Sequence, residues 1–421
     1  MRYQTLLSSL FCLAAMANAQ MTQPVKFQTV KSVQLSADDR IAAQERRLKD
    51  DPNNPEVQAA LASAFIQKLR ETTDFAYLNR AATLVDRILT ANPASYDGLR
   101  LSAEIETHRH NFPRSAELAN RLLQKNPSDS GALGMLGDSL MEMGQYENAG
   151  KIYERMVMIS PNLASYNRLA YYKFVTGDKQ KALDWMATAV QAGSPTAENL
   201  AWCLVEFGDM LFKTGHTADA HIVYERSLEA LPGYHRALAA LGREYAAEGK
   251  FDEAQASFLK AQTVIPLPEY AGSLDAIYTK MGRSTEAEQQ RQLLDVIEKL
   301  GRVNGEKGNR TLALVYANEN RHLDLAMQQI TGELETRKDV YTYDALSWVL
   351  FRSGKQKEAE EASRKALSMH TPEPMFLYHA GVIAMTSGDK SAGKELLTQA
   401  LALNPEFSWP EASDAKERLL P

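Results

Sequence analysis

Few residues in this chain have the types and spacing that catalysis requires. The 421-residue sequence contains eight histidines and two cysteines. It has no glycine-rich phosphate-binding loop followed by lysine, and no GxSxG, HExxH or CxxC motif. Carboxylates are spread along the whole chain, so no particular pair stands out as an acid–base couple. We therefore expect a protein that is not an enzyme and that binds no cofactor or metal ion.

Two short patterns are candidate ligand sites. His108 and His110 form an HxH pair, but zinc needs more ligands than two, and the pair falls in a predicted turn between helices. Gly131, Gly134 and Gly137 fall inside a predicted helix, where close helix packing explains them better than a phosphate site. Both patterns favour a structural role.

Cys203 and a glycosylation sequon are the remaining candidates for covalent chemistry. Cys203 lies in an apolar run with Trp202 and Leu204, which favours a buried small hydrophobic residue over a reactive thiol. The sequon begins at Asn309 and matters only in a eukaryotic host.

Proline spacing is the strongest signal in the sequence. Six of the sixteen prolines form a series with steps of 34 residues, except for one step of 37 between Pro195 and Pro232. A fixed period of this length is typical of a solenoid built from repeated helical units. Because proline cannot continue a helix, each one is expected to end the second helix of a unit. The series comprises Pro93, Pro127, Pro161, Pro195, Pro232 and Pro266.

The clearest unit spans residues 235–266. Leu238, Leu241 and Tyr245 have the i, i+3, i+7 spacing of one apolar helix face. Gly249 is expected to end this helix, since glycine readily adopts the left-handed conformation of a helix C-terminus. A second apolar series then begins at Phe251 and ends before Pro266. The unit is therefore predicted to be a helix–turn–helix.

Small and aromatic residues recur at matching places in several units. Gly242 and Ala254 are expected where the two helices cross, because a larger side chain would push them apart. Tyr245 and Phe258 are expected to fill the gap toward the neighbouring unit. Equivalent residues elsewhere are Gly137, Gly208, Ala116, Ala149, Ala220, Tyr153 and Tyr224.

This pattern resembles the tetratricopeptide repeat, a 34-residue helix–turn–helix with small residues at its eighth and twentieth positions. The resemblance implies an all-α fold, a right-handed superhelix of about ten such repeats. The copies begin near residues 55, 96, 130, 163, 201, 235, 268, 307, 340 and 374. The copies at 268 and 307 fit least well, and the second has Arg321 where a turn glycine is usual.

The ends of the chain depart from the repeat. Residues 1–19 have a basic start, a short apolar run and a small-x-small ending, which predicts a signal peptide cleaved after Ala19. Residues 20–50 are expected to form a flexible leader and a partial N-terminal helix that Ser36 or Asp38 caps. The repeat array is assigned to 51–407, and 408–421 to a C-terminal capping helix. The protein is therefore expected to be exported, either periplasmic or secreted.

Charge and cysteine content limit the partners. The formal net charge is −6, and the loss of Arg2 with the signal peptide takes it to −7. This argues against nucleic acid as a partner. The mature chain would keep one cysteine and so could form no internal disulfide. No second apolar run is long enough to cross a membrane.

In proteins that this chain resembles, partners bind in a concave groove lined by the first helix of each repeat. Transferring those groove positions to this sequence predicts a partner-binding set. Trp348 is expected to contribute to packing as well. The set consists of Arg100, Glu104, Asn167, Arg168, Tyr171, Arg236, Arg243, Tyr341, Asp344, Trp348, Tyr378 and His379.

One subtype of this family captures a peptide's terminal carboxylate with lysine and asparagine residues of adjacent repeats. Here Asn167 and Arg168 match in part, but the neighbouring copy has Gly134 and Asp138 instead. The clamp is therefore not expected.

The leading hypothesis is a non-catalytic scaffold of a bacterial cell envelope that binds a protein or peptide segment in its groove. A second is a glycan-binding or accessory subunit of a secreted polysaccharide or enzyme complex, since groove tyrosines and tryptophan can stack on sugars. A third is a cytoplasmic adaptor whose N-terminus only resembles a signal peptide. The longer proline step predicts a bend or an added loop near Trp202 and Cys203.

Overall fold

A computed structural model describes residues 36–194, 196–303 and 306–420. Within these ranges the chain is all-α: every regular element is an α-helix except one short 3₁₀ turn, Leu367–Met369. The predicted signal peptide and most of the predicted leader lie outside the described residues. The all-α, repeat-built fold class is confirmed.

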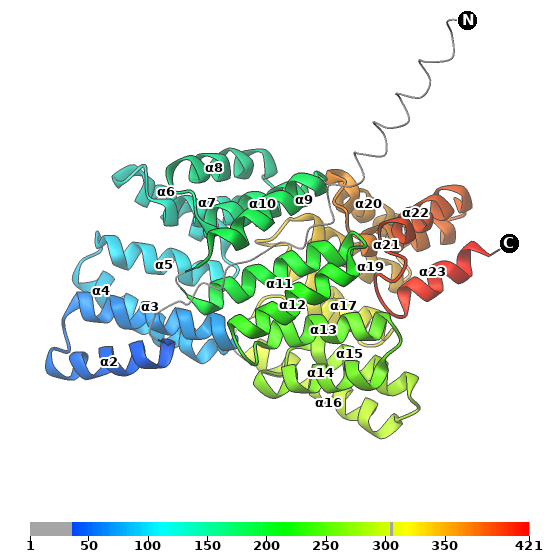
Figure 1. The fold of residues 1–421 in the computed structure, drawn as a ribbon, viewed down its shortest axis with the longest axis horizontal. Helices are drawn as coiled ribbons and strands as arrows, with labels where there is room; N and C mark the ends of the chain where they lie inside the picture. The colour runs from blue at the N-terminus through cyan, green and yellow to red at the C-terminus, as the bar shows by residue number, and fades with distance from the viewer. Residues whose placement is uncertain (1–35, 195, 304–305, 421) are drawn as a thin grey trace, which may run out of the picture. The chain divides into compact units, whose positions relative to one another are not determined.

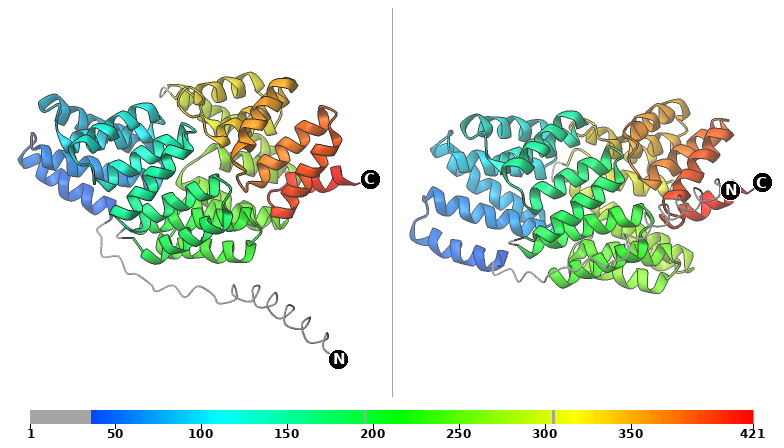
Figure 2. Two further views of the ribbon diagram at one scale, coloured as in Figure 1. Left: turned by 90° about the horizontal axis from the view of Figure 1, so that it is seen from above. Right: turned by 45° about the horizontal axis from the view of Figure 1, so that its top comes forward.

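The helices form ten antiparallel hairpins, with α2 before them and α23 after them (Figure 1). Both views in Figure 2 show consecutive hairpins stacked side by side from the blue to the red end of the chain. The helices are α2 (Ala37–Asp50), α3 (Pro55–Thr72), α4 (Phe75–Ala91), α5 (Tyr96–His108), α6 (Phe112–Lys125), α7 (Ser130–Glu142), α8 (Tyr146–Ile159), α9 (Leu163–Val175), α10 (Lys179–Ala192), α11 (Ala197–Lys213), α12 (Thr217–Ala230), α13 (His235–Ala247), α14 (Phe251–Val264), α15 (Pro268–Lys280), α16 (Ser284–Val303), α17 (Arg310–Asn318), α18 (Leu323–Glu333), α19 (Val340–Arg352), α20 (Gln356–Ala366), α21 (Pro374–Thr386), α22 (Lys390–Leu403) and α23 (Glu411–Leu419).

Local sequence explains where these helices begin and end. Asn54, Asp129 and Asp339 cap first helices by accepting hydrogen bonds from backbone N–H groups of the first turn. The second helices α4 and α6 end one or two residues before Pro93 and Pro127. The prediction that prolines end second helices is confirmed there and at the other described repeat prolines.

Three of the described hairpins are held close by a ring that lies directly on a helix backbone. A Cβ added at Gly137 would lie 2.3 Å from the Tyr153 ring, and one added at Gly208 would meet Tyr224 at the same distance. Gly242 faces Phe258 in the same way, at 2.9 Å. Glycine is thus required at these crossings because no side chain fits beneath the ring.

The added loop expected near Trp202 is not found among the described residues, and the repeat that begins near 307 takes its turn at a different residue from the one expected. The extra residues between Pro195 and Pro232 add no loop after Ala197: they lengthen α11, which has 17 residues where α9 and α13 have 13. In the repeat that begins near 307, the turn position belongs to Asn320, not to Arg321. Asn320 adopts a positive φ of 53° there, which asparagine tolerates better than most residues.

The described ends of the chain are helical. Ser36 caps α2 by accepting a hydrogen bond from the Asp39 backbone N–H, as expected. At the other end α23 buries Ala412 and Ala415 against the last hairpin. None of the helices in the described part of the chain has the length and apolar character needed to cross a membrane.

Candidate functional site

The predicted groove side chains lie on first helices, and several tie one repeat to the next. The Arg168 guanidinium of α9 donates to both carboxylate oxygens of Asp138 on α7, at 2.8–3.1 Å. The Tyr153 hydroxyl donates to the same carboxylate at 2.9 Å. Arg243 on α13 pairs with Asp209 on α11 in the same manner, at 2.8 Å. These arginines are already engaged within the chain.

Four of the five predicted groove residues of the ninth and tenth hairpins are buried, namely Asp344, Trp348, Tyr378 and His379. The His379 Nδ1 lies 3.0 Å from the Asp344 carboxylate, and the Trp348 indole stacks on the His379 ring at 4.3 Å. The Trp348 Nε1–H donates to Asn318 at 2.7 Å. Only 5% of Trp348 is exposed, which agrees with the expectation that it contributes to packing.

The remaining polar groove residues vary in exposure. The Tyr378 hydroxyl donates to Asp414 of α23 at 2.8 Å, and Asn167 is buried. Arg100 and Glu104 are half-buried on α5 and lie 3.9 Å apart. Their role in partner binding stays a prediction.

Three predicted groove residues keep polar groups without a partner among the described residues. Tyr171 and Tyr341 are half-buried, and neither hydroxyl makes a hydrogen bond there. Arg236 is half-buried and forms no ion pair in the described part of the chain. Tyr171 of α9 and Tyr341 of α19 line one narrow gap, although 170 positions separate them in the sequence.

These two tyrosines meet because distant repeats touch. Three turns within hairpins pack against three loops between hairpins that lie almost 200 residues later in the chain. We call this line of contacts the seam. It joins residues 142–146, 175–178 and 212–216 to residues 336–340, 368–373 and 403–407.

Hydrogen bonds repeat along the seam with the period of the repeats. The Lys338 backbone N–H donates to the Glu142 carbonyl at 2.7 Å. Thr371 Oγ1 donates to the Val175 carbonyl at 2.6 Å. Further along, Asn404 Nδ2 donates to the Phe212 carbonyl at 2.7 Å. The seam therefore satisfies backbone carbonyls at the ends of α7, α9 and α11, which a helix leaves without internal partners.

Turn glycines allow the two sides of the seam to approach. Gly144 has a φ of 73°, and a Cβ there would lie 2.6 Å from the Lys338 carbonyl oxygen. Gly215 has a φ of 85° and faces the Leu403 carbonyl at the same distance. Gly249, at the equivalent turn of a hairpin outside the seam, has nothing within 4 Å. Glycine is therefore needed at the seam for two reasons: it tolerates the positive φ, and it has no Cβ that would clash with the facing carbonyl oxygen.

A compact charge cluster lies at the first seam contact. Arg337 Nε lies 2.7 Å from the Glu142 carboxylate and Arg337 Nη1 lies 3.5 Å from Glu333. Arg310 Nη1 lies 3.1 Å from both Asp339 oxygens. Three carboxyl groups therefore face two guanidinium groups.

The pKa values of Glu142 and Asp339 are shifted in opposite directions. Burial raises the pKa of Glu142 from 4.5 to about 8, against the opposing charge of Arg337. Burial would also raise the pKa of Asp339, but the charges of Arg310 and Arg337 outweigh it and hold that pKa below its usual range.

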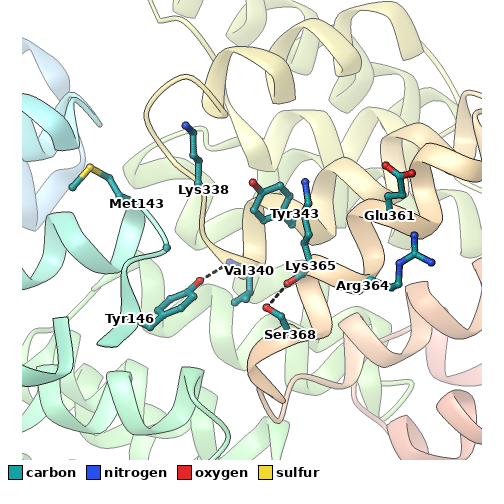
Figure 3. Close-up of a pocket in the computed structure, with 10 residues that line it drawn as sticks. Met143, Tyr146, Lys338, Val340, Tyr343, Glu361, Arg364, Lys365 and Ser368 are labelled. Carbon is teal, nitrogen blue, oxygen red and sulfur yellow. Dashed lines mark hydrogen bonds between the residues drawn. The ribbon is translucent and has the colours of Figure 1, made fainter. Parts of the chain in front are cut away.

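A hollow opens at the same contact, lined from both sides of the seam (Figure 3). Its volume is about 640 Å³, within the range of ligand pockets. Figure 3 shows Met143 and Tyr146 on one side and the side chains of α19 and α20 on the other. We call this hollow the seam pocket; its lining residues are Met143, Gly144, Tyr146, Lys338, Val340, Tyr343, Glu361, Arg364, Lys365 and Ser368.

None of these lining residues was predicted from the sequence. The period assigns Lys338 to a loop and Lys365 to the outer helix of a repeat, and it carries no information about which distant turn lies opposite. In the structure the Lys365 ammonium lies 4.9 Å from the Tyr343 ring centroid. The contact of the turn at Gly144 with the loop at Lys338 depends on the superhelical pitch, which the sequence does not encode in any local pattern.

His108 and His110, the HxH pair, are not arranged as metal ligands. His110 is the turn residue after α5, with a φ of 57°, and its ring stacks on Phe112. Burial and the charge of Arg337 lower the pKa of His110 to about 3, so it is neutral at physiological pH. No group of three or more metal-ligating side chains comes together within the described ranges.

Family comparisons identify the repeated unit. Residues 108–164 and 235–266 each match a model of the tetratricopeptide repeat. These stretches are tetratricopeptide repeats. Proteins built from such repeats generally mediate protein–protein interactions, and neither model describes an enzyme. No curated protein matches the chain.

Several solved structures are similar to this chain or to part of it. MamA is 23% identical over 38% of this chain and 93% of its own, with a TM-score of 0.31. PilW, a widely conserved type IV pilus biogenesis factor, is 15% identical over 48% of this chain and 92% of its own, with a TM-score of 0.41. The APC/C hetero-tetramer Cut9–Hcn1 is 13% identical over 91% and 93%, with a TM-score of 0.38. These similarities concern the fold alone.

The seam contact of Gly144 can be measured by substitution. Gly144→Ala is expected to destabilise the protein by about 1–3 kcal/mol more than Gly249→Ala, because both changes strain a positive φ but only the first meets a carbonyl oxygen. Chemical denaturation of both variants gives the difference. Equal losses of stability would show that the seam contact contributes nothing.

The raised pKa of Glu142 predicts a pH dependence of stability. The folded state holds a proton that the unfolded chain releases above about pH 4.5, so stability falls as pH rises toward about 8 and then levels off. One proton gives a slope of at most about 1.4 kcal/mol per pH unit. Glu142→Gln is expected to remove this slope when denaturation is followed between pH 5 and 8.

Glu147→Gln is the matched control for that measurement. Glu147 is exposed on α8, and its hydrogen bond to Lys151 lowers its pKa, so it stays ionised across the same pH range. Its removal is expected to leave the slope between pH 5 and 8 unchanged. A Glu142→Gln profile parallel to that of the unmodified protein would contradict the assignment of the proton.

Proposed function

We propose that this protein is a non-catalytic scaffold of a bacterial cell envelope, which binds a segment of another protein along the first helices of its repeats. The tetratricopeptide repeats at 108–164 and 235–266 support protein binding. The predicted signal peptide in residues 1–19 motivates the envelope location. Side chains at equivalent positions of successive first helices would contact the partner.

The observation that carries this proposal is the set of polar groups left without internal partners on that face. Arg168 and Arg243 are engaged by Asp138 and Asp209, whereas Arg236 has no ion pair among the described residues. A guanidinium without a partner can donate in several directions to carbonyl or carboxylate oxygens of a bound segment. Arginine and tyrosine are also enriched at the energetic centres of protein interfaces.

The glycan-binding alternative receives less support from the same residues. Stacking on a sugar requires an exposed aromatic face, but Trp348 and Tyr378 are 5% and 6% exposed. Trp348 is already stacked on His379 and on Phe351. Tyr171 and Tyr341 are half-buried in a narrow gap. The Arg236 guanidinium, which makes no ion pair among the described residues, favours a protein segment over a glycan as the ligand.

Capture from an envelope extract tests the binding face. The purified chain is expected to retain a protein partner, and the double variant Arg236→Ala with Tyr171→Phe is expected to retain at least about tenfold less. Arg121→Ala, at an exposed position on α6, is the control and should retain the same partner as the unmodified chain. Equal capture by all three proteins would exclude this face.

Export is tested separately by the mass of the mature protein. Cleavage after Ala19 predicts a chain that begins at Gln20 in the envelope fraction of the source cells. Intact-mass measurement distinguishes it from a chain that keeps Met1. The full-length mass would contradict the envelope location while leaving the binding proposal in place.

A further inference from the structure

The lining of the seam pocket is basic, whereas the chain as a whole is acidic. Lys338, Arg364 and Lys365 line it, and Glu361 is the one carboxylate among its lining residues. The chain as a whole carries a net charge of −6. A locally basic hollow on an acidic protein attracts anions to one place, because the surrounding charge repels them elsewhere.

The three cations of the pocket are not neutralised by the described residues. Neither Lys338, Arg364 nor Lys365 makes an ion pair there, whereas many of the chain's other arginines and lysines do. Lys365 lies over the Tyr343 ring, a contact that holds the ammonium toward the hollow without cancelling its charge. Side chains held in this way are available to a ligand.

The walls between these cations are apolar. Met143 and Val340 lie on opposite sides of the seam, and Tyr146 and Tyr343 add aromatic surface (Figure 3). Tyr146 is fixed in place, since its hydroxyl accepts a hydrogen bond from the Val340 backbone N–H at 2.8 Å. A ligand that fits this lining combines carboxylates with an apolar group between them.

We propose that the seam pocket binds an acidic peptide segment of a partner protein, with its carboxylates on Lys338 and Arg364 and an apolar side chain against Met143 and Tyr146. None of the residues that line the pocket belongs to the predicted groove set, and the pocket lies where two distant hairpins meet. This inference rests on the proposed function in one respect, namely that the partner is a protein.

Direct binding of a synthetic peptide tests the pocket without the natural partner. The probe is a short fluorescein-labelled peptide of four glutamates around one leucine, and its counterpart has glutamine in place of each glutamate. Fluorescence anisotropy is expected to show saturable binding of the glutamate peptide to the full chain. Binding should weaken as salt is raised, because exposed charges are screened. No binding of the glutamate peptide, or equal binding of the glutamine peptide, would overturn the proposal.

Two matched variants locate the binding. Lys338→Ala with Arg364→Ala removes two pocket cations and is expected to weaken peptide binding at least about tenfold. Lys357→Ala with Lys394→Ala removes two exposed cations outside the pocket lining and should have little effect. Equal weakening in both variants would mean non-specific attraction and would contradict the proposal. Displacement of the peptide by a lower concentration of a short oligonucleotide would assign the pocket to phosphate instead.

The two proposals fail independently. The peptide titration uses only the purified chain, so it can succeed when the extract yields no partner. Conversely, the Lys338 and Arg364 double variant could capture the partner in full while the peptide does not bind. That result would reject the pocket and leave the first-helix face as the binding surface.

Discussion

The contact of an aromatic ring with a glycine backbone determines how closely the helices pack in three of the described hairpins. Tyr153 on Gly137 and Tyr224 on Gly208 leave no space for even one methyl group. Because hairpins stack on one another, the spacing within a hairpin is carried to its neighbours and accumulates along the array. The seam depends on this accumulation, since its turns and loops meet only if the intervening hairpins add up to the right displacement.

Ion pairs between repeats reduce the number of first-helix side chains that are available to a partner. Arginines that would otherwise face a partner are used to hold successive repeats in register, as Arg168 is by Asp138. The lengthened α11 contributes in a similar way: Glu198 in its added turn lies 3.2 Å from Arg70 of α3. Side chains that join repeats and side chains that remain free are therefore mixed on one face, and only the structure separates them.

The sequence predicted whatever depends on neighbours within one repeat. The helix ends before Pro93 and Pro127, the turn at Gly249 and the close crossing at Gly242 all follow from local chemistry and the 34-residue period. The same reasoning failed at Arg321, because Asn320 takes the left-handed turn position without any glycine to mark it. It could not predict the pairing of Lys338 with Glu142, since that contact reflects the sum of small rotations over several hairpins.

The distance along the chain between seam partners has a consequence for folding. An open array of repeats joins only neighbours, so its parts can form and open one after another. Here Thr371 bonds to Val175 and Asn404 bonds to Phe212, contacts that span 196 and 192 residues. Such contacts raise the contact order, which slows folding, and they link the opening of one end to the opening of the middle. The molecule is accordingly built to lose its structure as a single cooperative unit, not repeat by repeat.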